Sequence, residues 1–136
     1  MLQRLRYLPL KPFRNNYDYT NFGLTAAAQA VATAAGTDWA TLSEQSIYQP
    51  LGMNSTSSRF ADFVARTNRA PGHIRRNGAF VVGPARDPDA QSPAGGVSSS
   101  VNDMAKWMAF VLANGQPLMP AAALLPALFP QVISSP

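Results

Sequence analysis

The chain has 136 residues, a length typical of a single domain, and its 46% hydrophobic and 13% charged residues are compatible with a folded core. The absence of cysteine excludes disulfides, thiol catalysis and cysteine-ligated metal sites, and leaves the redox compartment open. The formal net charge of +4 comes mostly from arginine, but aspartates interleave with the arginines of residues 59–89 and no aromatic-basic alternation is present. We therefore expect a solvated basic surface and no nucleic-acid partner.

The first ten residues predict neither a signal peptide nor a long helix. Arg4 and Arg6 interrupt the apolar stretch and Pro9 follows it, so the segment lacks the uninterrupted apolar core of a signal peptide. We expect a short helical turn followed by a loop. No apolar run in the sequence reaches the length of a membrane span, and the compartment of the protein is left undecided.

The firmest predicted helix begins near Phe22 and ends at Gly36. Asn21 precedes it and is a candidate N-cap, because a side-chain oxygen at that position can accept from an orphan backbone N–H. The face expected to be buried consists of residues that recur at helical spacing, namely Leu24, Ala28, Val31 and Ala35.

A second helix is predicted to follow at once. Thr37 or Asp38 would cap its start, and Pro50 would end it, because a proline cannot continue a helix. Its apolar side is expected to comprise Trp39, Leu42, Ser46 and Ile47. The tryptophan is interpreted as a core residue.

Periodicity fades between residues 54 and 93, where turn residues predominate. Asn77-Gly78 is a hairpin-turn signal, and Ala79–Val82 is the best strand candidate. We expect a small β-hairpin or a long ordered loop here. His73, the only histidine, is interpreted as a loop residue, and a single histidine does not predict a metal site.

The last main helix is predicted from Ser100 to Asn114-Gly115. Residues 100–103 form a plausible capping box, and the glycines of residues 95–96 allow a tight turn before it. The apolar face expected to be buried comprises Val101, Met104, Ala105, Met108, Val111 and Leu112. Residues 120–136 allow one short helix broken near Pro126.

Several short blocks are combined in a characteristic order. Tyr19-Thr20-Asn21 precedes the first helix, and later blocks are Pro50-Leu51-Gly52-Met53 with Thr56, Pro93-Ala94-Gly95-Gly96-Val97-Ser98-Ser99 and Asp103-Met104-Ala105. From about Leu5 to about Gln116 the chain resembles the serine β-lactamase-like family, which includes class C β-lactamases, D,D-peptidases, D-aminopeptidases and esterases. The ordered set is far more specific than any one block.

The resemblance implies roles for two residues of the Tyr-x-Asn block. Tyr19 matches the tyrosine that shares general acid-base work with a lysine, and Asn21 matches the asparagine that contacts the substrate. The same family uses a Ser-x-x-Lys nucleophile motif and a strand motif such as Lys-Thr-Gly, and neither occurs in this sequence. The family chemistry requires no metal or cofactor, and none is expected.

Each of these residues also has a purely structural interpretation. Tyr19 could be a packed aromatic residue that hydrogen-bonds through its hydroxyl, and Asn21 could cap the helix behind it. One asparagine side chain cannot readily cap the helix and bind a substrate. Tyr17 has no asparagine at the matching position, so it is interpreted as a packing residue or a cleft wall.

The resemblance predicts a mainly α chain with a small β-hairpin, a fragment of the α+β β-lactamase/transpeptidase-like fold. Residues 1–136 would be a single segment, the helical part of a catalytic domain. The implied function is part of a serine hydrolase that cleaves amide or ester carbonyls of a β-lactam, D-amino-acid peptide or ester through an acyl-enzyme, with the isolated chain inactive. The alternative is a non-catalytic remnant or interaction module whose exposed apolar faces associate with another copy or a partner chain.

Overall fold

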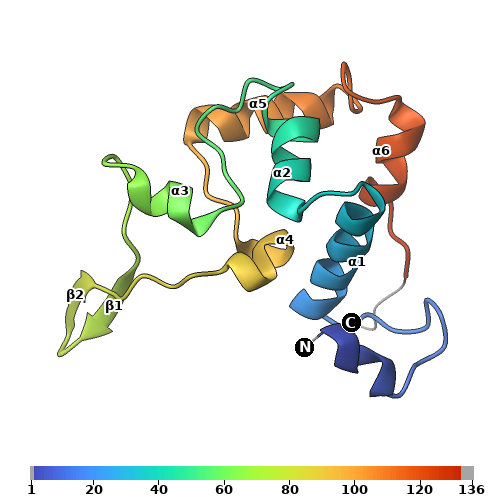
Figure 1. Ribbon diagram of the computed structural model, residues 1–136, viewed down its shortest axis with the longest axis horizontal. Helices are drawn as coiled ribbons and strands as arrows, with labels where there is room; N and C mark the ends of the chain where they lie inside the picture. Colours follow the sequence, from blue (N-terminus) through green and yellow to red (C-terminus); the bar gives the residue numbers. More distant parts are fainter. Residues whose placement is uncertain (1, 133–136) are drawn as a thin grey trace.

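The computed structural model describes residues 2–132, and most of the regular structure in this range is helical. Figure 1 shows the helices grouped in one body from which a single hairpin projects. In chain order the elements are the 3-10 helix η1 (Leu2–Tyr7), α1 (Asn21–Ala34), α2 (Trp39–Ser43), the π-helix η2 (Glu44–Tyr48), α3 (Phe60–Ala65), β1 (His73–Arg76), β2 (Ala79–Val82), the 3-10 helix η3 (Asp89–Gln91), α4 (Ser92–Gly95), α5 (Val101–Leu112) and α6 (Ala121–Leu128).

Helix α1 buries small residues rather than its larger apolar ones. Thr25, Ala28 and Ala32 are buried, and the helix packs on α4 and α2, which can approach closely because alanine side chains are short. Leu24 and Val31, which were expected in the buried face, are 61% and 57% exposed. Ala35 is exposed as well, so the prediction for this face is confirmed only at Ala28, and the true face is rotated towards Thr25.

The two signals predicted at the ends of the loop between α1 and α2, Gly36 and Asp38, are confirmed. Gly36 adopts φ +70°, a left-handed conformation that glycine adopts without a Cβ penalty, and its N–H donates to the carbonyl of Thr33. The Asp38 carboxylate accepts from the backbone N–H of Thr41 at 2.9 Å and thus caps α2. The hydrogen bonds from Thr41 hold the pKa of Asp38 below its ordinary value.

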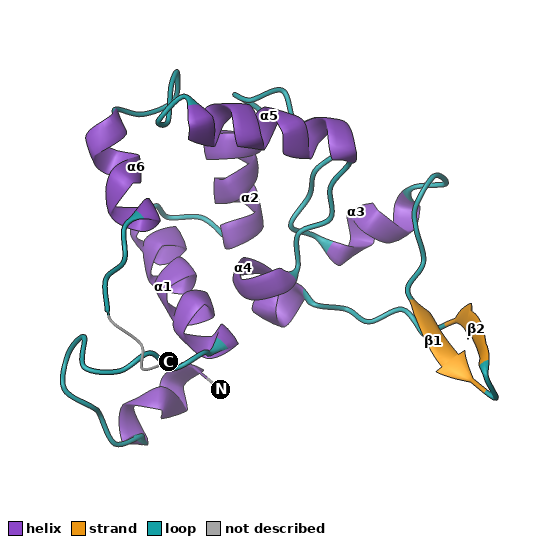
Figure 2. Cartoon of the chain, turned by 180° about the vertical axis from the view of Figure 1, so that it is seen from behind, coloured by secondary structure: helices purple, strands orange, loops and turns teal. Residues whose placement is uncertain are grey.

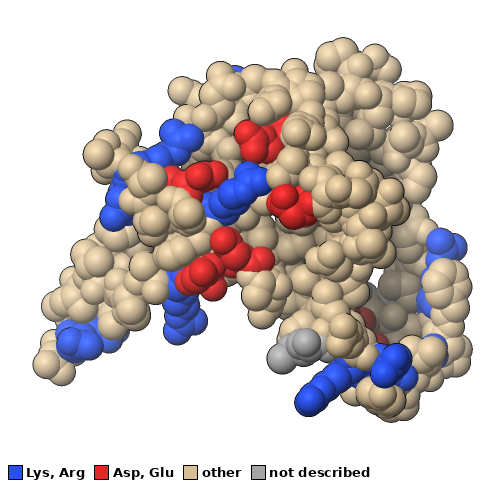
Figure 3. Space-filling model, viewed as in Figure 1, with Lys and Arg blue, Asp and Glu red and all other residues tan. Residues whose placement is uncertain are grey.

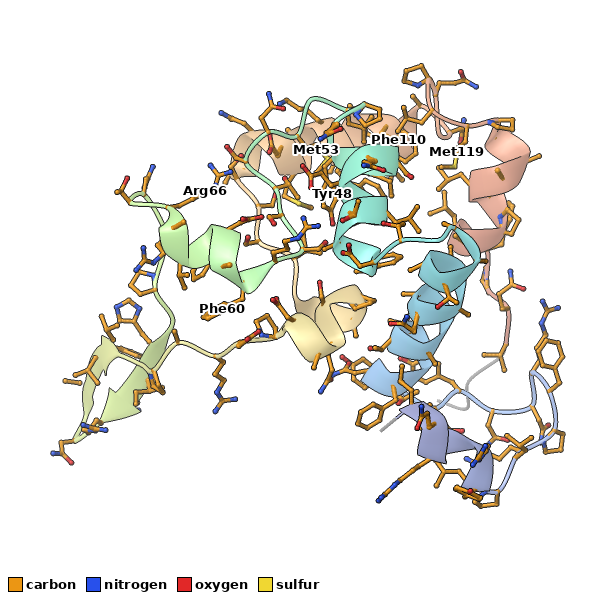
Figure 4. All side chains as sticks on the ribbon, in the orientation of Figure 1. Tyr48, Met53, Phe60, Arg66, Phe110 and Met119 are labelled. Carbon is orange, nitrogen blue, oxygen red and sulfur yellow. The ribbon has the colours of Figure 1, made fainter. Side chains whose placement is uncertain are left out.

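Helix α2 continues into the π-turn η2 and ends before Pro50, as the sequence predicted. Tyr48 at its end and Met53 after it are both buried, at 8% and 3% exposure. Figure 4 shows these two side chains near Phe110 of α5. The three side chains belong to the small apolar centre of the molecule.

Hydroxyl groups join the surrounding segments. The buried Ser58 hydroxyl hydrogen-bonds to Ser43 at 3.1 Å and to Tyr48 at 2.8 Å, and the Ser92 hydroxyl donates to the Ser58 carbonyl at 2.7 Å. Ser57 and Ser98 exchange two backbone hydrogen bonds of 2.9 Å as an isolated antiparallel bridge. Residues far apart in sequence are therefore held by hydrogen bonds that replace a large apolar core.

Asp103 in the first turn of α5 is the charged member of this network and is only 3% exposed. Its carboxylate accepts from the Ser55 N–H at 2.7 Å, from the Thr56 hydroxyl at 2.9 Å and from Lys106 at 3.0 Å. Burial by itself raises the pKa of Asp103, but the hydrogen bonds from Lys106, Ser55 and Thr56 outweigh it and hold the pKa below its ordinary value.

The predicted capping box at α5 is half confirmed. The Ser100 hydroxyl accepts from the Asp103 N–H at 3.2 Å, as an N-cap should. The Asp103 side chain does not complete the box, because its oxygens are occupied by residues 55, 56 and 106.

The apolar face predicted for α5 is mostly exposed. Val101, Met104, Met108 and Leu112 are 87%, 43%, 60% and 80% exposed, whereas the buried positions of the helix are Asp103 and Phe110. The helix therefore leaves most of the predicted apolar face unburied. We call the four exposed residues the α5 stripe.

The projecting hairpin confirms the predicted turn and strand. Asn77 and Gly78 have φ of 50° and 83°, which is the positive-φ pair required by a tight two-residue turn. Strands β1 and β2 pair antiparallel from His73↔Val82 to Arg76↔Ala79, so His73 belongs to a strand and its interpretation as a loop residue is wrong. Seen from behind in Figure 2, the hairpin lies away from the helices, and all its residues are exposed.

Helices α3 and α4 and the 3-10 helix η3 were not predicted from the sequence, and α6 differs from its prediction. Helix α3 was not expected, because its six residues are too few to show a clear period. Helix α6 includes Pro126 and ends two residues after it, so the helix is not broken at the proline. The last four residues of the predicted tail, 133–136, lie outside the described residues.

Candidate active site

The Tyr-x-Asn block lies at the start of α1, where the chain passes from an extended loop into the helix. Thr20 is the N-cap, with φ −156°, and its hydroxyl accepts from the Phe22 N–H at 3.2 Å. The prediction that Asn21 could cap the helix is therefore wrong, because the preceding residue does so. Asn21 is the first helical residue, and within residues 2–132 its side chain has no hydrogen-bond partner.

The backbone of Asn21 is nevertheless well held. Its carbonyl accepts from the Thr25 hydroxyl at 2.8 Å, and Thr25 is buried at 7% exposure. The Asn21 side chain does not cap the helix, and its backbone is held in place. The side chain is therefore available for another partner. This geometry removes the competition between capping and substrate contact.

Tyr19 and Tyr17 both point into solvent. Tyr19 is 81% exposed and its hydroxyl makes no hydrogen bond to any residue between 2 and 132. The structural interpretation of Tyr19 as a packed, hydrogen-bonded aromatic is therefore wrong for this structure. Tyr17 is 62% exposed, which also excludes a packing role within the described chain.

Both lysines of the chain are already paired. Lys11 donates to the two carboxylate oxygens of Asp18 at 2.9 Å each, and Lys106 donates to Asp103 and to the carbonyl of Gly52. A phenol becomes a useful base near neutral pH when an ammonium group lies beside it. Each ammonium group therefore already has a carboxylate partner, and neither forms a hydrogen bond with Tyr19 in the described part of the chain.

Asn21 borders a recess of about 270 Å³. Gly95 of α4 also lines it, and the other lining residues come from the connector between the hairpin and α4, namely Arg86, Asp87, Pro88, Ala90 and Gln91. The connector is fixed because Asp89 accepts from the Phe60 N–H at 2.7 Å and Asp87 accepts from the Asp89 N–H at 2.9 Å.

The segment around Gly96 is fixed by close packing. A Cβ at Gly96 would lie 2.5 Å from the Ser92 Cα, so no other residue fits without moving α4. This explains the glycine in the Pro93-to-Ser99 block as a packing requirement. The same block provides Ser98 and Ser99, which bond to Ser57 and Thr56 respectively.

Sequence reasoning did not find the residues that connect these blocks. The Thr56 hydroxyl and the Asp103 carboxylate meet at 2.9 Å, although they lie in different blocks of the sequence. Arg86 was noted only as part of a basic surface. The described residues contain no cluster of histidine, aspartate and glutamate that could hold a metal ion.

The chain matches the Beta-lactamase family over residues 1–133. It belongs to the beta-lactamase family. Among curated proteins, this beta-lactamase-family chain is 32% identical over 115 residues to the unguisins hydrolase ungD of Aspergillus violaceofuscus, covering 79% of the chain and 20% of that protein. It is 36% identical over 66 residues to beta-lactamase-like protein 4 of Dictyostelium discoideum, covering 48% of the chain and 11% of that protein.

A solved structure supports the fold of this beta-lactamase-family chain. The octameric penicillin-binding protein homologue from Pyrococcus abyssi superposes with a TM-score of 0.76 at 22% identity, covering 88% of the chain and 26% of that structure. The mainly helical chain with one hairpin is thus a fragment of the β-lactamase and penicillin-binding-protein fold, as predicted. The chain spans about a fifth of the length of the first of these relatives. No helix within residues 2–132 has the length and apolarity needed to cross a bilayer.

Proposed function

We propose that residues 1–136 are one helical segment of a serine hydrolase that cleaves an amide or ester carbonyl through an acyl-enzyme. In this proposal Tyr19 moves the proton and Asn21 contacts the substrate. The observation that carries it is the cap at Thr20, which leaves the Asn21 amide free beside the 270 Å³ recess. The exposure of Tyr19 is also what a residue that must reach a reacting group requires.

The chemistry needs groups that this sequence does not contain. In acyl transfer a serine oxygen attacks the carbonyl, its proton passes to a base, the leaving group takes a proton, and water later releases the acyl group. Backbone N–H groups hold the oxyanion. The sequence has no Ser-x-x-Lys, and both its lysines are paired, so the nucleophile and the activating ammonium group would come from other parts of the enzyme.

The test compares Tyr19, which belongs to the Tyr-x-Asn block, with Tyr17, which does not. Both side chains are exposed. In the intact enzyme that contains this segment, Tyr19→Phe should lower kcat/KM about 10²- to 10⁴-fold, the range typical of a lost general acid-base group. Tyr17→Phe is the matched control and should change it less than about twofold. Equal effects of the two substitutions would refute the assignment of Tyr19.

The isolated chain should not catalyse acyl transfer. A phenol without a nucleophile cannot begin covalent catalysis. Incubation of the purified chain with a chromogenic β-lactam and with a short-chain ester should give no turnover above buffer. Turnover that Tyr19→Phe abolishes would instead reveal a nucleophile within these residues.

One observation favours the alternative, a non-catalytic module that associates with another chain. The α5 stripe exposes four apolar side chains on one side of a helix, which is unusual for the surface of a soluble monomer. Sedimentation over a concentration series would test self-association. A mass that rises with concentration and returns to the monomer value in Met108→Gln supports the alternative, whereas a monomer that binds no hydrophobic dye opposes it.

A further inference from the structure

The projecting hairpin presents basic and apolar side chains together to solvent. Every residue of β1 and β2 is exposed, and Figure 1 shows the hairpin standing out from the helical body. Paired residues of an antiparallel ladder place their side chains on the same face, so Arg75 and Phe80 share one face with His73 and Val82. On this face, which we call the hairpin face, Phe80 and Val82 are 75% and 63% exposed.

The segment that contains the hairpin carries charge of one sign. Its arginines are Arg66, Arg69, Arg75, Arg76 and Arg86, and residues 63–86 include no aspartate or glutamate. On the side of the molecule shown in Figure 3 the acidic side chains gather over the centre, while the tip of the hairpin shows only basic ones. An anionic surface can therefore approach the hairpin without meeting a carboxylate of this segment.

The two arginines of the hairpin have no partner among residues 2–132. Neither Arg75 nor Arg76 forms a side-chain hydrogen bond or an ion pair there, whereas Lys11 pairs with Asp18 at 2.9 Å and Arg6 donates to the Tyr7 hydroxyl at 2.8 Å. The guanidinium group of an arginine is planar and offers several N–H donors to phosphate oxygens. Both hairpin arginines are therefore available for an anionic partner.

The hairpin face is too small for a stable protein partner. Four residues per strand, at about 3.4 Å each, and two strands about 4.8 Å apart give a face of roughly 14 by 10 Å. Its area is about 140 Å², whereas a standard protein interface buries about 800 Å² on each partner. A small projecting element is better suited to a soft surface into which it can partly sink.

The surface of an anionic bilayer satisfies both kinds of side chain at once. Amphipathic elements bury their apolar side chains about 5–10 Å into the boundary between headgroups and acyl chains, while their cations stay at the headgroups. Arg75 and Phe80 are directly opposite each other in the ladder, so the guanidinium can remain at the lipid phosphates when the ring enters this boundary. An acidic polypeptide would pair with the arginines, but it would need a further apolar site to cover Phe80.

We propose that the hairpin docks this chain on a membrane surface that contains anionic lipids. Arg75 and Arg76 lie at the lipid phosphates, and the Phe80 ring is inserted below them. The contact is peripheral and leaves the helical body outside the bilayer. It goes beyond the proposed function, because it requires neither Tyr19 nor Asn21 and involves no chemical step.

Cosedimentation of the 136-residue chain with lipid vesicles tests the proposal. Vesicles of equal parts phosphatidylcholine and phosphatidylglycerol should bind the chain at least about tenfold more tightly than vesicles of phosphatidylcholine alone. Phe80→Ser should weaken binding to the anionic vesicles by about tenfold, and so should Arg75→Gln combined with Arg76→Gln. Because these positions are exposed, circular dichroism should show both variants folded as the unchanged chain is.

The matched control is Phe13→Ser combined with Arg14→Gln. Phe13 is 89% exposed, and the Arg14 guanidinium lies 5.1 Å from its ring centroid, so the pair has the same chemistry as the one in the hairpin. It lies before α1, outside the hairpin. This variant should bind anionic vesicles as tightly as the unchanged chain.

Three results would overturn the proposal. The two kinds of vesicle could bind the chain equally; the Phe13 and Arg14 variant could lose as much binding as the hairpin variants, which would indicate diffuse attraction by any exposed basic and aromatic group; or only one of the two hairpin variants could lose binding, which would indicate charge attraction alone or apolar adsorption alone. None of these results bears on the acyl-transfer proposal, which the Tyr19→Phe comparison decides.

Discussion

The centre and the periphery of this chain are stabilised in opposite ways. In the centre, Ser58 and Asp103 are 2% and 3% exposed, and each is held by hydrogen bonds from several segments. At the periphery, the hairpin and the loop that contains Tyr19 expose nearly every side chain. Tyr19 and Asn21, the residues with proposed roles in function, belong to the exposed periphery.

This difference indicates how a chain with few buried apolar residues can keep a defined shape. A buried hydroxyl or carboxylate adds little net stability when satisfied, but is costly when one partner is removed. A hydrogen-bonded centre is therefore specific and sensitive to substitution. The exposed periphery should tolerate substitution. Four experiments compare the loss of stability on substitution in the centre with the loss at the periphery.

The largest effect is expected from Asp103→Asn. The amide nitrogen would face donors from Ser55, Thr56 and Lys106, of which an asparagine oxygen can satisfy only part. We expect the free energy of unfolding to fall by about 2–4 kcal/mol, measured by urea denaturation with circular dichroism.

Asp62→Asn is the matched control for that substitution. Asp62 is exposed and accepts one hydrogen bond of 2.6 Å from the Ser57 hydroxyl. Its substitution should cost under about 0.5 kcal/mol, as is usual for surface positions. Equal losses for the two aspartates would mean that burial does not distinguish the centre from the periphery.

The second effect is a loss of stability in acid. Asp103 and Asp38 have folded-state pKa values below the ordinary aspartate value of about 3.9, so they bind protons less readily when folded than when unfolded. Their stabilisation is complete above that ordinary value and is lost as the pH falls through the lowered values. Urea midpoints measured between neutral pH and acid should fall over this range, and Asp103→Asn should flatten the fall.

A smaller effect is expected from Tyr48→Phe. The substitution removes the hydroxyl that bonds to Ser58 at 2.8 Å but keeps the ring, and Ser58 retains its bond to Ser43. The loss should be about 0.5–1.5 kcal/mol. The double variant Tyr48→Phe with Ser43→Ala should lose more than the sum of the single losses, because Ser58 would then have neither hydroxyl partner; strict additivity in the urea midpoints would contradict a shared network.

The smallest effect is expected in the hairpin. Phe80 is 75% exposed and is paired across the hairpin with Arg75. Phe80→Ser should change the unfolding free energy by less than about 0.5 kcal/mol. A loss as large as that of Tyr48→Phe would show that the hairpin packs against something in solution and is not part of an exposed periphery.

Signals that act over a few residues predicted local structure well. Each of these signals depends on a φ preference or on one side-chain hydrogen bond. The structure confirms the turn at Asn77-Gly78, the helix end at Gly36 and the helix caps Asp38 and Ser100. The prediction of Asn21 as cap was wrong, because the neighbouring Thr20 can also accept a backbone N–H and only the backbone geometry selects one of them.

The buried faces of the helices could not be predicted in the same way. Apolar periodicity assumes that the apolar side of a helix packs within the same chain, yet α1 buries Thr25 and α5 buries Asp103. The burial of Asp103 accompanies hydrogen bonds from the distant residues Ser55 and Thr56, which leave no period in the sequence.

The hydrogen bond from the Ser92 hydroxyl to the Ser58 carbonyl has a consequence for how this chain can change over evolutionary time. The chain leaves the centre at Ser58 and returns to it at Ser92. The segment between them contains α3 and the hairpin, and this hydrogen bond holds its two ends together. Doubling the length of a flexible closed loop costs only about 0.6 kcal/mol. Insertions and deletions in residues 60–88, or replacement of the hairpin, can therefore accumulate while the centre is inherited unchanged. This segment is the region where homologous chains are free to diverge in what they recognise.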